Sequence, residues 1–347
     1  MKKKVLIILG VLLITIIIGL IIFVNINLGS VSKKSEDVEF TIEAGTNKVE
    51  IVSNLKKANL IKNEFATLIY VFFTPNVNMQ AGTFKINRNE TVKEIIKQIS
   101  SGDTKMEKTI TLTLVEGMRF TEYAKQISET FNIPYDDIIN KCSDTTYLDS
   151  LIEKYWFIDD SIKNSSIYYP LEGYLYPDTY EFYENSTIED IITKLLDNMD
   201  NKLTYYKDEI NSSSYSVHEL LTIASIAEKE ALNEEDRKTV AQVIYKRLDI
   251  GMSLGMDVTS YYGVKKDLTD DITTDDLNAV NAYNTRNKDF IGLPVGPICS
   301  PSLESIDATL NPSNTDYIYF IADIKTGEVF FANSYEDFVN YKNDLGD

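Results

Sequence analysis

The sequence is poor in the residues that carry most metal and nucleophilic chemistry. Its two cysteines, Cys142 and Cys299, lie far apart, and no Cys-x-x-Cys pair or Cys/His cluster is present, which excludes a structural zinc site. His218 is the only histidine, so a Ser-His-Asp or Cys-His mechanism would rest on it alone. We expect His218 to be a surface residue in the capping region of a helix. Carboxylates therefore remain as the candidates for acid–base chemistry.

Clustered positive charge is lacking as well. The 347 residues include 34 Lys and Arg against 53 Asp and Glu, a formal net charge of −19. Phosphate contacts need a basic stripe, and none follows the N-terminus, so nucleic acid is excluded as a partner. The hydrophobic content of 44% is that of a folded protein with a core, and the length allows two domains.

One long apolar run is present, Val5–Val24, and Lys2, Lys3 and Lys4 precede it. A run of about 20 residues spans a bilayer as a helix. It exceeds the apolar region of a cleavable signal peptide, which is the alternative, and no small-residue cleavage site follows. The lysines ahead of the run place the N-terminus in the cytoplasm. The sequence thus predicts a single-pass membrane protein whose remaining chain is extracytoplasmic.

Small strand–turn–helix patterns follow a short polar linker, 29–37. The first covers residues 38–55, a looser one covers 84–102, and a third covers 110–127. Such modules resemble LysM-type glycan-binding units, which combine short strands and helices in a compact fold. The alternative is common supersecondary structure with no binding role. Residues 104–108 are a plausible boundary between this module and the next domain.

An aromatic stretch, Tyr168–Thr187, combines many tyrosines with Glu172 and Asp178. Rings stack on sugar C–H faces and carboxylates accept hydroxyl protons, so the stretch, Tyr174 included, suits carbohydrate. The alternative is a buried aromatic loop that packs under a domain. Further on, Tyr283, Asn284 and Thr285 offer directional hydrogen bonds.

Helical spacing and turn signals divide the remainder. Residues 188–206 predict a helix, residues 251–264 and 282–301 predict loops, and residues 317–331 predict a hairpin that turns at Lys325–Gly327.

The central stretch, Leu220–Arg247, contains two predicted helices. Ser216 and Glu219 form a capping box for the first, whose apolar stripe ends beside Glu230. A carboxyl group at the end of an apolar face is partly desolvated, which raises its pKa and suits a general acid. Glu228 points to a different side. The alternative is that the Glu-Lys-Glu triplet is a solvated helix turn.

The second helix begins after Asn233 as N-cap and ends before Gly251. The turn between the helices sets Arg237 where it can reach back to a carboxylate of the triplet.

Six segments together resemble the YceG-like endolytic murein transglycosylases. They lie in the family's order behind one N-terminal membrane helix, and they are VEGMRF (115–120), LEGYLYPDTY (171–180), ASIAEKE (224–230), the Asp-Arg-initiated helix (236–248), AYNT (282–285) and GLPVGPICSP (292–301). Two departures are visible. Gly255–Thr259 keeps only Asp257 and Thr259 of the family's Gln-[Ser/Thr]-Asp-Pro-Thr segment, and Val295 and Ser300 replace the family's more usual Pro and Asn.

The resemblance implies a membrane-anchored lyase that cuts nascent peptidoglycan strands internally. It cleaves the MurNAc-β-1,4-GlcNAc bond, leaves 1,6-anhydroMurNAc ends and terminates glycan elongation, with peptidoglycan synthases as further partners. By that likeness Glu230 is the catalytic acid and base. Glu228 and Arg237 are expected to support it, Glu228 by hydrogen bonding or by like-charge proximity that raises the pKa of Glu230. Substrate contacts are expected from Glu172, Tyr174, Asp178, Asp257, Thr259, Tyr283, Asn284 and Thr285.

One carboxyl group suffices for this reaction, because the sugar's own 6-hydroxyl replaces water as nucleophile. No metal and no cofactor is expected. Two alternatives stay open: a non-catalytic membrane-tethered glycan-binding scaffold, and a muramidase-type hydrolase with Asp257 or Glu172 as second carboxylate. The expected fold class is α+β, with residues 1–37 as cytoplasmic tip, transmembrane helix and linker, 38–106 as a LysM-like module, and 107–347 as a mixed α+β catalytic domain with a helical centre.

Overall fold

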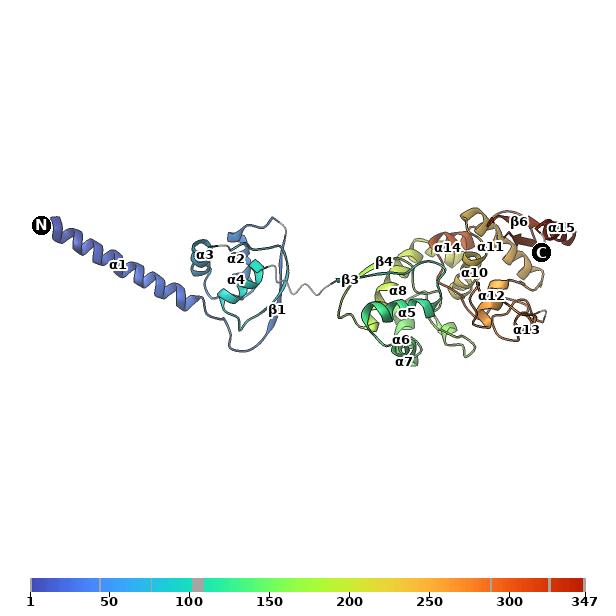
Figure 1. Ribbon diagram of the computed structural model, residues 1–347, viewed down its shortest axis with the longest axis horizontal. Helices are drawn as coiled ribbons and strands as arrows, with labels where there is room; N and C mark the ends of the chain where they lie inside the picture. Colours follow the sequence, from blue (N-terminus) through green and yellow to red (C-terminus); the bar gives the residue numbers. More distant parts are fainter. Residues whose placement is uncertain are drawn as a thin grey trace. The chain divides into compact units, whose positions relative to one another are not determined.

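The computed structural model describes residues 2–43, 45–75, 77–101, 109–287, 289–323 and 326–345. The expected boundary at 104–108, Lys325 of the expected turn and the side chains of Lys2–Lys4 lie outside the described part. The chain divides into two compact units, Met1–Thr109 and Ile110–Asp347 (Figure 1). Each unit is described by itself.

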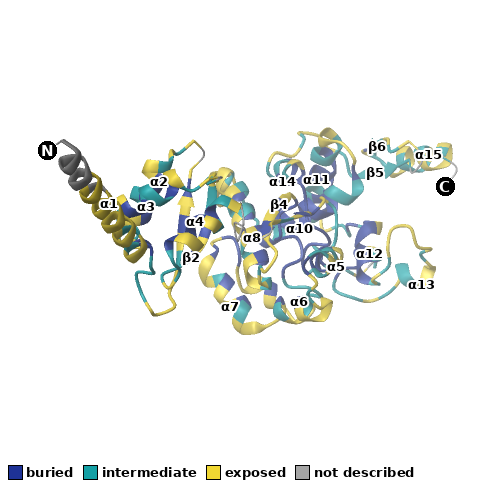
Figure 2. Ribbon diagram, turned by 60° about the vertical axis from the view of Figure 1, so that its left-hand side comes forward, coloured by how far each residue is buried: buried dark blue, intermediate teal, exposed yellow. Residues whose placement is uncertain are grey.

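Unit 1 begins with the apolar helix that the sequence predicts, α1 (Lys2–Asn27). Its segment Gly10–Asn27 has a mean hydropathy of 2.5 and none of it is buried within the protein. Figure 2 shows this helix exposed along its length beyond the undescribed first turns. A helix of this length and composition is compatible with a membrane anchor or a signal sequence.

The rest of unit 1 packs three helices on a two-stranded antiparallel sheet. Strand β1 (Asp37–Ile42) pairs with β2 (Gly82–Asn87), which sets Phe40 opposite Phe84 in the core. The helices are α2 (Lys48–Lys57), α3 (Glu64–Phe73) and α4 (Val92–Ser101). The strand predicted at 38–42 and the helix predicted after Gly45 are confirmed, whereas α3 was not predicted.

The expected linker 29–37 is not a free tether. Leu28, directly after α1, is buried in the core of unit 1, and its carbonyl accepts a hydrogen bond from the Val92 N–H at 3.0 Å. Ser32 N–H donates to the Arg88 carbonyl at 3.1 Å. Residues 29–36 form no helix or strand, as predicted for a linker, and these backbone contacts attach them to unit 1. The end of α1 is therefore built into unit 1.

Unit 2 is a mixed α+β body, in agreement with the predicted fold class. In chain order its elements are β3 (Thr109–Thr113), α5 (Phe120–Phe131), α6 (Tyr135–Lys141), α7 (Thr145–Lys154), the 3₁₀ turn η1 (Asp160–Lys163), β4 (Thr179–Tyr183), α8 (Ile188–Tyr205), α9 (Lys207–Ser212), α10 (Val217–Glu230), α11 (Glu234–Asp249), α12 (Asp257–Gly263), α13 (Thr274–Leu277), α14 (Leu303–Leu310), β5 (Tyr319–Ala322), β6 (Val329–Ala332) and α15 (Tyr335–Leu345). Strand β3 pairs with β4, and β5 pairs antiparallel with β6. The predicted helix at 188–206 and the predicted hairpin are confirmed. Helix α12 lies where a loop was expected.

Two apolar cores meet at α10. The larger core takes Leu220, Leu221 and Ala224 from this helix, and the smaller core takes Ile223, Ile226 and Ala227. Because the two sets lie on different sides of a 3.6-residue period, α10 is enclosed almost all round. Figure 2 shows it among the most buried elements of unit 2. The helical centre predicted for this domain is thus a buried helix that joins two cores.

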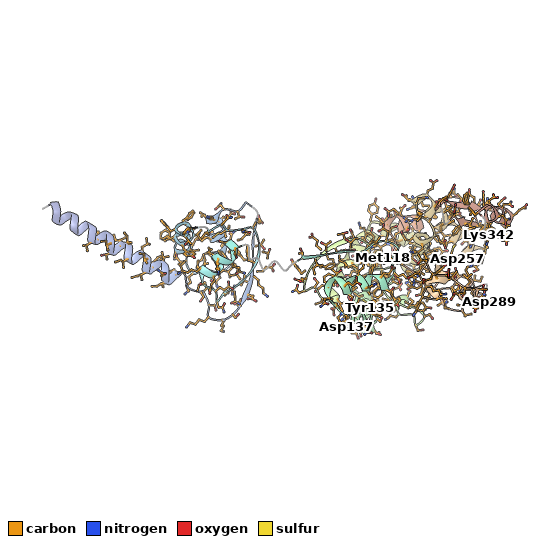
Figure 3. All side chains as sticks on the ribbon, in the orientation of Figure 1. Met118, Tyr135, Asp137, Asp257, Asp289 and Lys342 are labelled. Atoms are coloured by element: carbon orange, nitrogen blue, oxygen red, sulfur yellow. The ribbon has the colours of Figure 1, made fainter. Side chains whose placement is uncertain are left out.

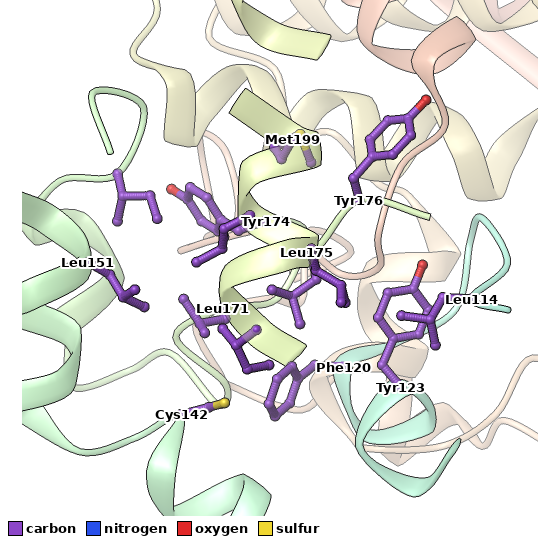
Figure 4. Close-up of a cluster of buried hydrophobic side chains, with 14 of the residues drawn as sticks. Leu114, Phe120, Tyr123, Cys142, Leu151, Leu171, Tyr174, Leu175, Tyr176 and Met199 are labelled. Atoms are coloured by element: carbon purple, nitrogen blue, oxygen red, sulfur yellow. The ribbon is translucent and has the colours of Figure 1, made fainter. Parts of the chain in front are cut away.

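Much of the tyrosine-rich stretch belongs to the larger core, as the alternative of a buried aromatic loop predicts, although Tyr183 is exposed. Leu171, Tyr174, Leu175 and Tyr176 are buried (Figure 4). The Tyr174 hydroxyl bonds His218 Nδ1 at 2.8 Å. Buried tyrosines need such polar partners, and sequence spacing did not reveal that one was available.

His218 is buried, which corrects its expected place on the surface. Only 7% of the residue is exposed, and its Nε2 bonds the Val295 carbonyl at 2.8 Å. It lies in the first turn of α10, as predicted, but it faces the interior, where Tyr174 and Val295 use both ring nitrogens.

Gly173 is required by the backbone of this stretch. It has φ +80°, and a Cβ built there would lie 2.4 Å from the Pro297 Cβ. We expect Gly173→Ala to lower the free energy of unfolding by about 2–5 kcal/mol, through left-handed backbone strain and overpacking together. Gly251→Ala is the matched control, because Gly251 has φ +64° with open space around it and carries only the strain, about 1 kcal/mol.

The measurement is urea unfolding of the full chain in detergent, followed through Trp156, the only tryptophan. Equal losses in the two variants would contradict the close packing of Gly173 against Pro297.

Candidate active site

Helix α10 begins with the predicted capping box. The Ser216 hydroxyl accepts a hydrogen bond from the Glu219 N–H at 3.3 Å, and the Glu219 carboxylate accepts from the Ser216 N–H at 2.8 Å. The helix ends at Glu230, and Ala231 is the C-cap. The predicted start of α11 is also confirmed, with Asn233 as N-cap and Gly251 just past the end. The two glutamates of the triplet therefore lie in the last turn of a buried helix.

An extended loop runs along α10. Val295 bonds His218 at one end, and the Ile298 N–H donates to Ser225 Oγ at 3.0 Å in the middle. At the other end Ser302 reaches Glu228. The described residues of the predicted loop at 282–301 contain no helix or strand, as expected. Its last part satisfies polar groups of a helix that has little solvent around it.

Glu228 is a fixed structural carboxylate. Its side chain is only 5% exposed, and one oxygen accepts from Arg237 Nη2 at 3.0 Å. The other oxygen accepts from the Ser302 N–H at 2.9 Å, the Ser302 hydroxyl at 2.5 Å and the Ser305 hydroxyl at 2.6 Å. The predicted reach of Arg237 to the triplet is confirmed. Glu228 thereby ties α10 to α11 and to the first turn of α14.

Lys229, between the two glutamates, also has a partner within the protein. Its Nζ donates to the Gly117 carbonyl at 3.2 Å, and the Gly117 N–H donates to the Ser300 carbonyl at 2.8 Å. Every side chain of the triplet thus has either a bonded partner or a charged neighbour. The alternative of a solvated helix turn is therefore wrong. The VEGMRF and GLPVGPICSP segments meet here, beside the end of α10.

Glu230 occupies a different environment, two positions beyond Glu228. It keeps part of its surface accessible, yet dense packing around the carboxyl group raises its pKa to about 8, with the nearby charge of Asp257 as the second cause. Arg247, Arg286 and a hydrogen bond from the Val258 backbone act in the opposite direction. A carboxyl group that is protonated at neutral pH and reachable from solvent has the properties of a general acid.

The like-charge neighbour of Glu230 is Asp257, which corrects the expectation that Glu228 would play this part. Glu228 is neutralised by Arg237 and turned toward α14. Asp257 begins α12 and forms an ion pair with Arg286 at 3.0 Å. Its own pKa is raised by burial and lowered by Arg286 and Lys342 (Figure 3).

Four of the expected substrate contacts are fully buried. Thr259 and Thr285 share a hydroxyl–hydroxyl bond of 2.8 Å, and the Thr285 hydroxyl accepts from the Met256 N–H at 3.0 Å. Asn284 accepts from the Ser260 hydroxyl at 2.6 Å, and Tyr283 accepts from the Tyr168 N–H at 3.3 Å. Direct contact with substrate does not fit side chains without exposed surface. They hold the Asp257 loop against residues 283–286.

Glu172 is also structural. It is 2% exposed, and its two oxygens accept from the Phe120 N–H and the Tyr262 hydroxyl, both at 2.8 Å. Burial raises its pKa to about 8. It holds α5 to α12, and Tyr174 is likewise enclosed, so neither side chain is open to a glycan. Asp178 is exposed and accepts from Asn198 at 3.0 Å.

Two arginines near Glu230 were not singled out from the sequence. Arg247 donates from Nε to the Ile318 carbonyl at 2.7 Å and from Nη1 to the Leu254 carbonyl, and its guanidinium lies 5.7 Å from the Tyr319 ring centroid. Arg286 pairs with Asp257. A signal was available, because the chain takes nearly all its positive charge from lysine. An arginine in such a chain indicates a place that needs the planar guanidinium.

Among the described residues, no group of three or more His, Cys, Asp or Glu side chains is placed to hold a metal ion. The two cysteines are free and buried.

A model of the YceG-like family matches residues 40–344. The chain belongs to this family. A crystal structure of a YceG-like protein from Listeria monocytogenes is 32% identical and covers 89% of this chain and 100% of that chain, with a TM-score of 0.64.

Curated relatives carry the name endolytic murein transglycosylase. The one from Bacillus subtilis is 35% identical over 302 residues, which cover 86% of this chain and 82% of the relative. Proteins from two strains of Streptococcus pneumoniae are 33% identical over 311 residues and 85% of this chain. The chain spans 56% of the length of those two relatives.

The contrast between the two glutamates predicts opposite effects on stability. Glu228→Ala leaves Arg237 buried without its partner and removes the acceptor at α14, and it should lower the free energy of unfolding by about 3–5 kcal/mol.

The pKa of Glu230 is raised in the folded state, so the wild type should lose stability as pH rises from about 5 to about 8. Glu230→Gln removes the ionisable group that causes this loss.

The Gln variant should lose less over that interval, because its side chain stays neutral. Urea unfolding at pH 5 and pH 9 measures both effects. An equal pH dependence in wild type and Glu230→Gln would contradict the raised pKa.

Proposed function

We propose that the chain is a lytic transglycosylase that cleaves MurNAc-β-1,4-GlcNAc bonds inside peptidoglycan strands. The observation that carries this proposal is Glu230, a partly accessible carboxyl group with a raised pKa at the rigid end of a buried helix. The names of the relatives supply the substrate class.

Glu230 performs both proton transfers in this proposal. Protonated at neutral pH, it donates its proton to the glycosidic oxygen as the C1–O bond breaks. The resulting carboxylate then removes the proton of the same sugar's 6-hydroxyl, whose oxygen forms the new bond to C1. The products are a free 4-hydroxyl and a 1,6-anhydro end, no water is consumed, and Glu230 is protonated again.

The charges around Glu230 suit both states of the carboxyl group. Asp257 and burial favour the acid before the first transfer, and Arg247 and Arg286 stabilise the carboxylate after it. Glu228 and Arg237 act at a distance, because they hold the last turn of α10 in place. We assign Tyr283, Asn284, Thr285 and Thr259 the same positioning role toward Asp257.

The location of the enzyme follows from α1. We propose that α1 is a single-pass anchor with a cytoplasmic N-terminus, that the catalytic unit is extracytoplasmic, and that the cleavage terminates growing strands beside peptidoglycan synthases. We also propose that the part of unit 1 after α1 is a LysM-like module that binds glycan. Its compact arrangement of two short strands and three helices supports this assignment.

A hydrolase that uses Asp257 as second carboxylate is the rival, because Asp257 is the carboxylate that influences Glu230 most. Glu172 is less suited to that part, since both its oxygens are bonded to the protein.

Digestion of uncrosslinked glycan strands by the full chain separates these functions. We expect new ends that are lighter than reducing ends by one water in mass spectrometry. Glu230→Gln should lower the rate by about 10²–10⁴-fold, since a general acid contributes that much. Reducing ends would indicate the hydrolase, and no cleavage the scaffold.

The pH profile tests the charges around Glu230. The rate should fall above about pH 8 as the acid ionises. Asp257→Asn removes the like charge and should move this limb to lower pH, whereas Arg286→Gln removes a favourable cation and should move it to higher pH.

For a transglycosylase, Asp257→Asn keeps its activity at low pH and still forms anhydro ends. Loss of all activity at every pH in a folded Asp257→Asn variant would instead support the hydrolase.

A further inference from the structure

Helix α3 of unit 1 is apolar on the side that faces away from the core. Its inner side carries Ala66, Thr67 and Val71, all buried. Phe65, Ile69, Phe72 and Phe73 recur at i, i+4, i+7 and i+8 and form one outward stripe, whereas Leu68 packs against the core. Phe65 is 60% exposed, Phe72 61% and Phe73 84%. Three large aromatic side chains facing outward on one short helix are costly in water.

This outward stripe lies close to the point where α1 leaves its apolar span. Helix α3 packs against α1, and Figures 1 and 2 both show it beside the C-terminal end of α1. Val24 of α1 and Leu68 of α3 are both partly buried and pack against the core that contains Val71 of α3. A Cβ built on Gly29 would lie 3.4 Å from Lys62 Nζ, two residues before α3 begins. A bilayer that contains α1 therefore has its surface near α3.

The two units of the chain differ in net charge. Residues 28–109, the part of unit 1 beyond α1, hold 12 Lys and Arg and 10 Asp and Glu, a net +2. Residues 110–347 hold 19 and 43, a net −24. Lys33, Lys34 and Lys62 are exposed around the end of α1. An anionic membrane surface attracts the first unit and repels the second.

We propose that α3 is an interfacial helix, whose stripe of Phe65, Ile69, Phe72 and Phe73 inserts at the headgroup boundary of the membrane in which α1 is anchored. The proposal rests on the proposed anchoring by α1. Helices of this kind lie in the plane of the interface with their apolar face about 5–10 Å deep. Contact through both α1 and α3 fixes the orientation of unit 1 on the membrane, which α1 alone leaves free to rotate about its axis.

Single-tryptophan reporters test this placement. Trp156 is the only tryptophan, so Trp156→Phe gives a silent background for the full chain. Phe73→Trp reports on α3, Phe23→Trp on α1, and Val49→Trp, on an exposed apolar position of α2, is the matched control. Each protein is reconstituted into vesicles of phosphatidylcholine and phosphatidylglycerol, with or without lipids brominated near the headgroup. Urea unfolding confirms that each variant is folded.

We expect Phe73→Trp and Phe23→Trp to lose about half their emission in brominated vesicles, and Val49→Trp to lose little. If Phe23→Trp is quenched and Phe73→Trp behaves like Val49→Trp, α3 is not interfacial, although the anchoring stands. If Phe73→Trp emission is blue-shifted but not quenched, the stripe is covered by a second copy or another protein, which also overturns the proposal. If Phe23→Trp is not quenched, the anchoring and this inference fail together.

Discussion

The position of the last turn of α10 depends on one buried ion pair and the hydrogen bonds around it. Glu228 takes a cation from α11 and three donors from the start of α14, so three helices share a single carboxylate. Removal of a charge from water is costly, and only this full set of partners makes the arrangement favourable. The same contacts fix the backbone at Glu230, because Glu230 follows Glu228 by two residues in the same helical turn. The two carboxyl groups therefore differ in role. Glu228 is paired with Arg237 and fixed, whereas Glu230 is protonated because of its surroundings and is accessible to solvent.

The surroundings of Glu230 come from three places in the sequence. Arg247 lies in the last turn of α11, and Asp257 begins α12. Arg286 lies in a loop that a hydrogen bond between the buried Thr285 and Thr259 hydroxyls joins to the Asp257 segment. Arg247 donates a hydrogen bond to the carbonyl of Ile318 beside the hairpin, which lies 71 residues further along the sequence. The raised pKa of Glu230 therefore depends on several elements of unit 2 together, and the sequence of α10 alone does not determine it.

Local signals were sufficient for much of this structure. The capping box at Ser216, the N-cap at Asn233 and the reach of Arg237 to a carboxylate of the triplet follow from spacing and helix ends alone. Long-range pairing was not readable in the same way: polar composition did not reveal the backbone bond of Ser32 to Arg88, and tyrosine content did not reveal that Tyr174 and Tyr176 are buried. Burial also changed the meaning of Tyr283, Asn284 and Thr285, whose hydrogen-bonding groups are satisfied within the protein. The partners of Glu230 were missed because Arg247 and Arg286 come close to it only in the fold.

The loop along α10 has a consequence for how the chemistry of this chain arises. Residues 295–302 bond His218, Ser225 and Glu228 of α10, so these buried polar groups have their partners only when the loop lies on the helix. In an unfolded chain Glu230 is an ordinary carboxylate, ionised at neutral pH and unable to donate a proton. Glu230 becomes a protonated acid at neutral pH only when residues 295–302 are packed on α10. Under the proposed function, a partly folded chain would be inactive toward glycan, and bond cleavage would itself measure the completion of folding.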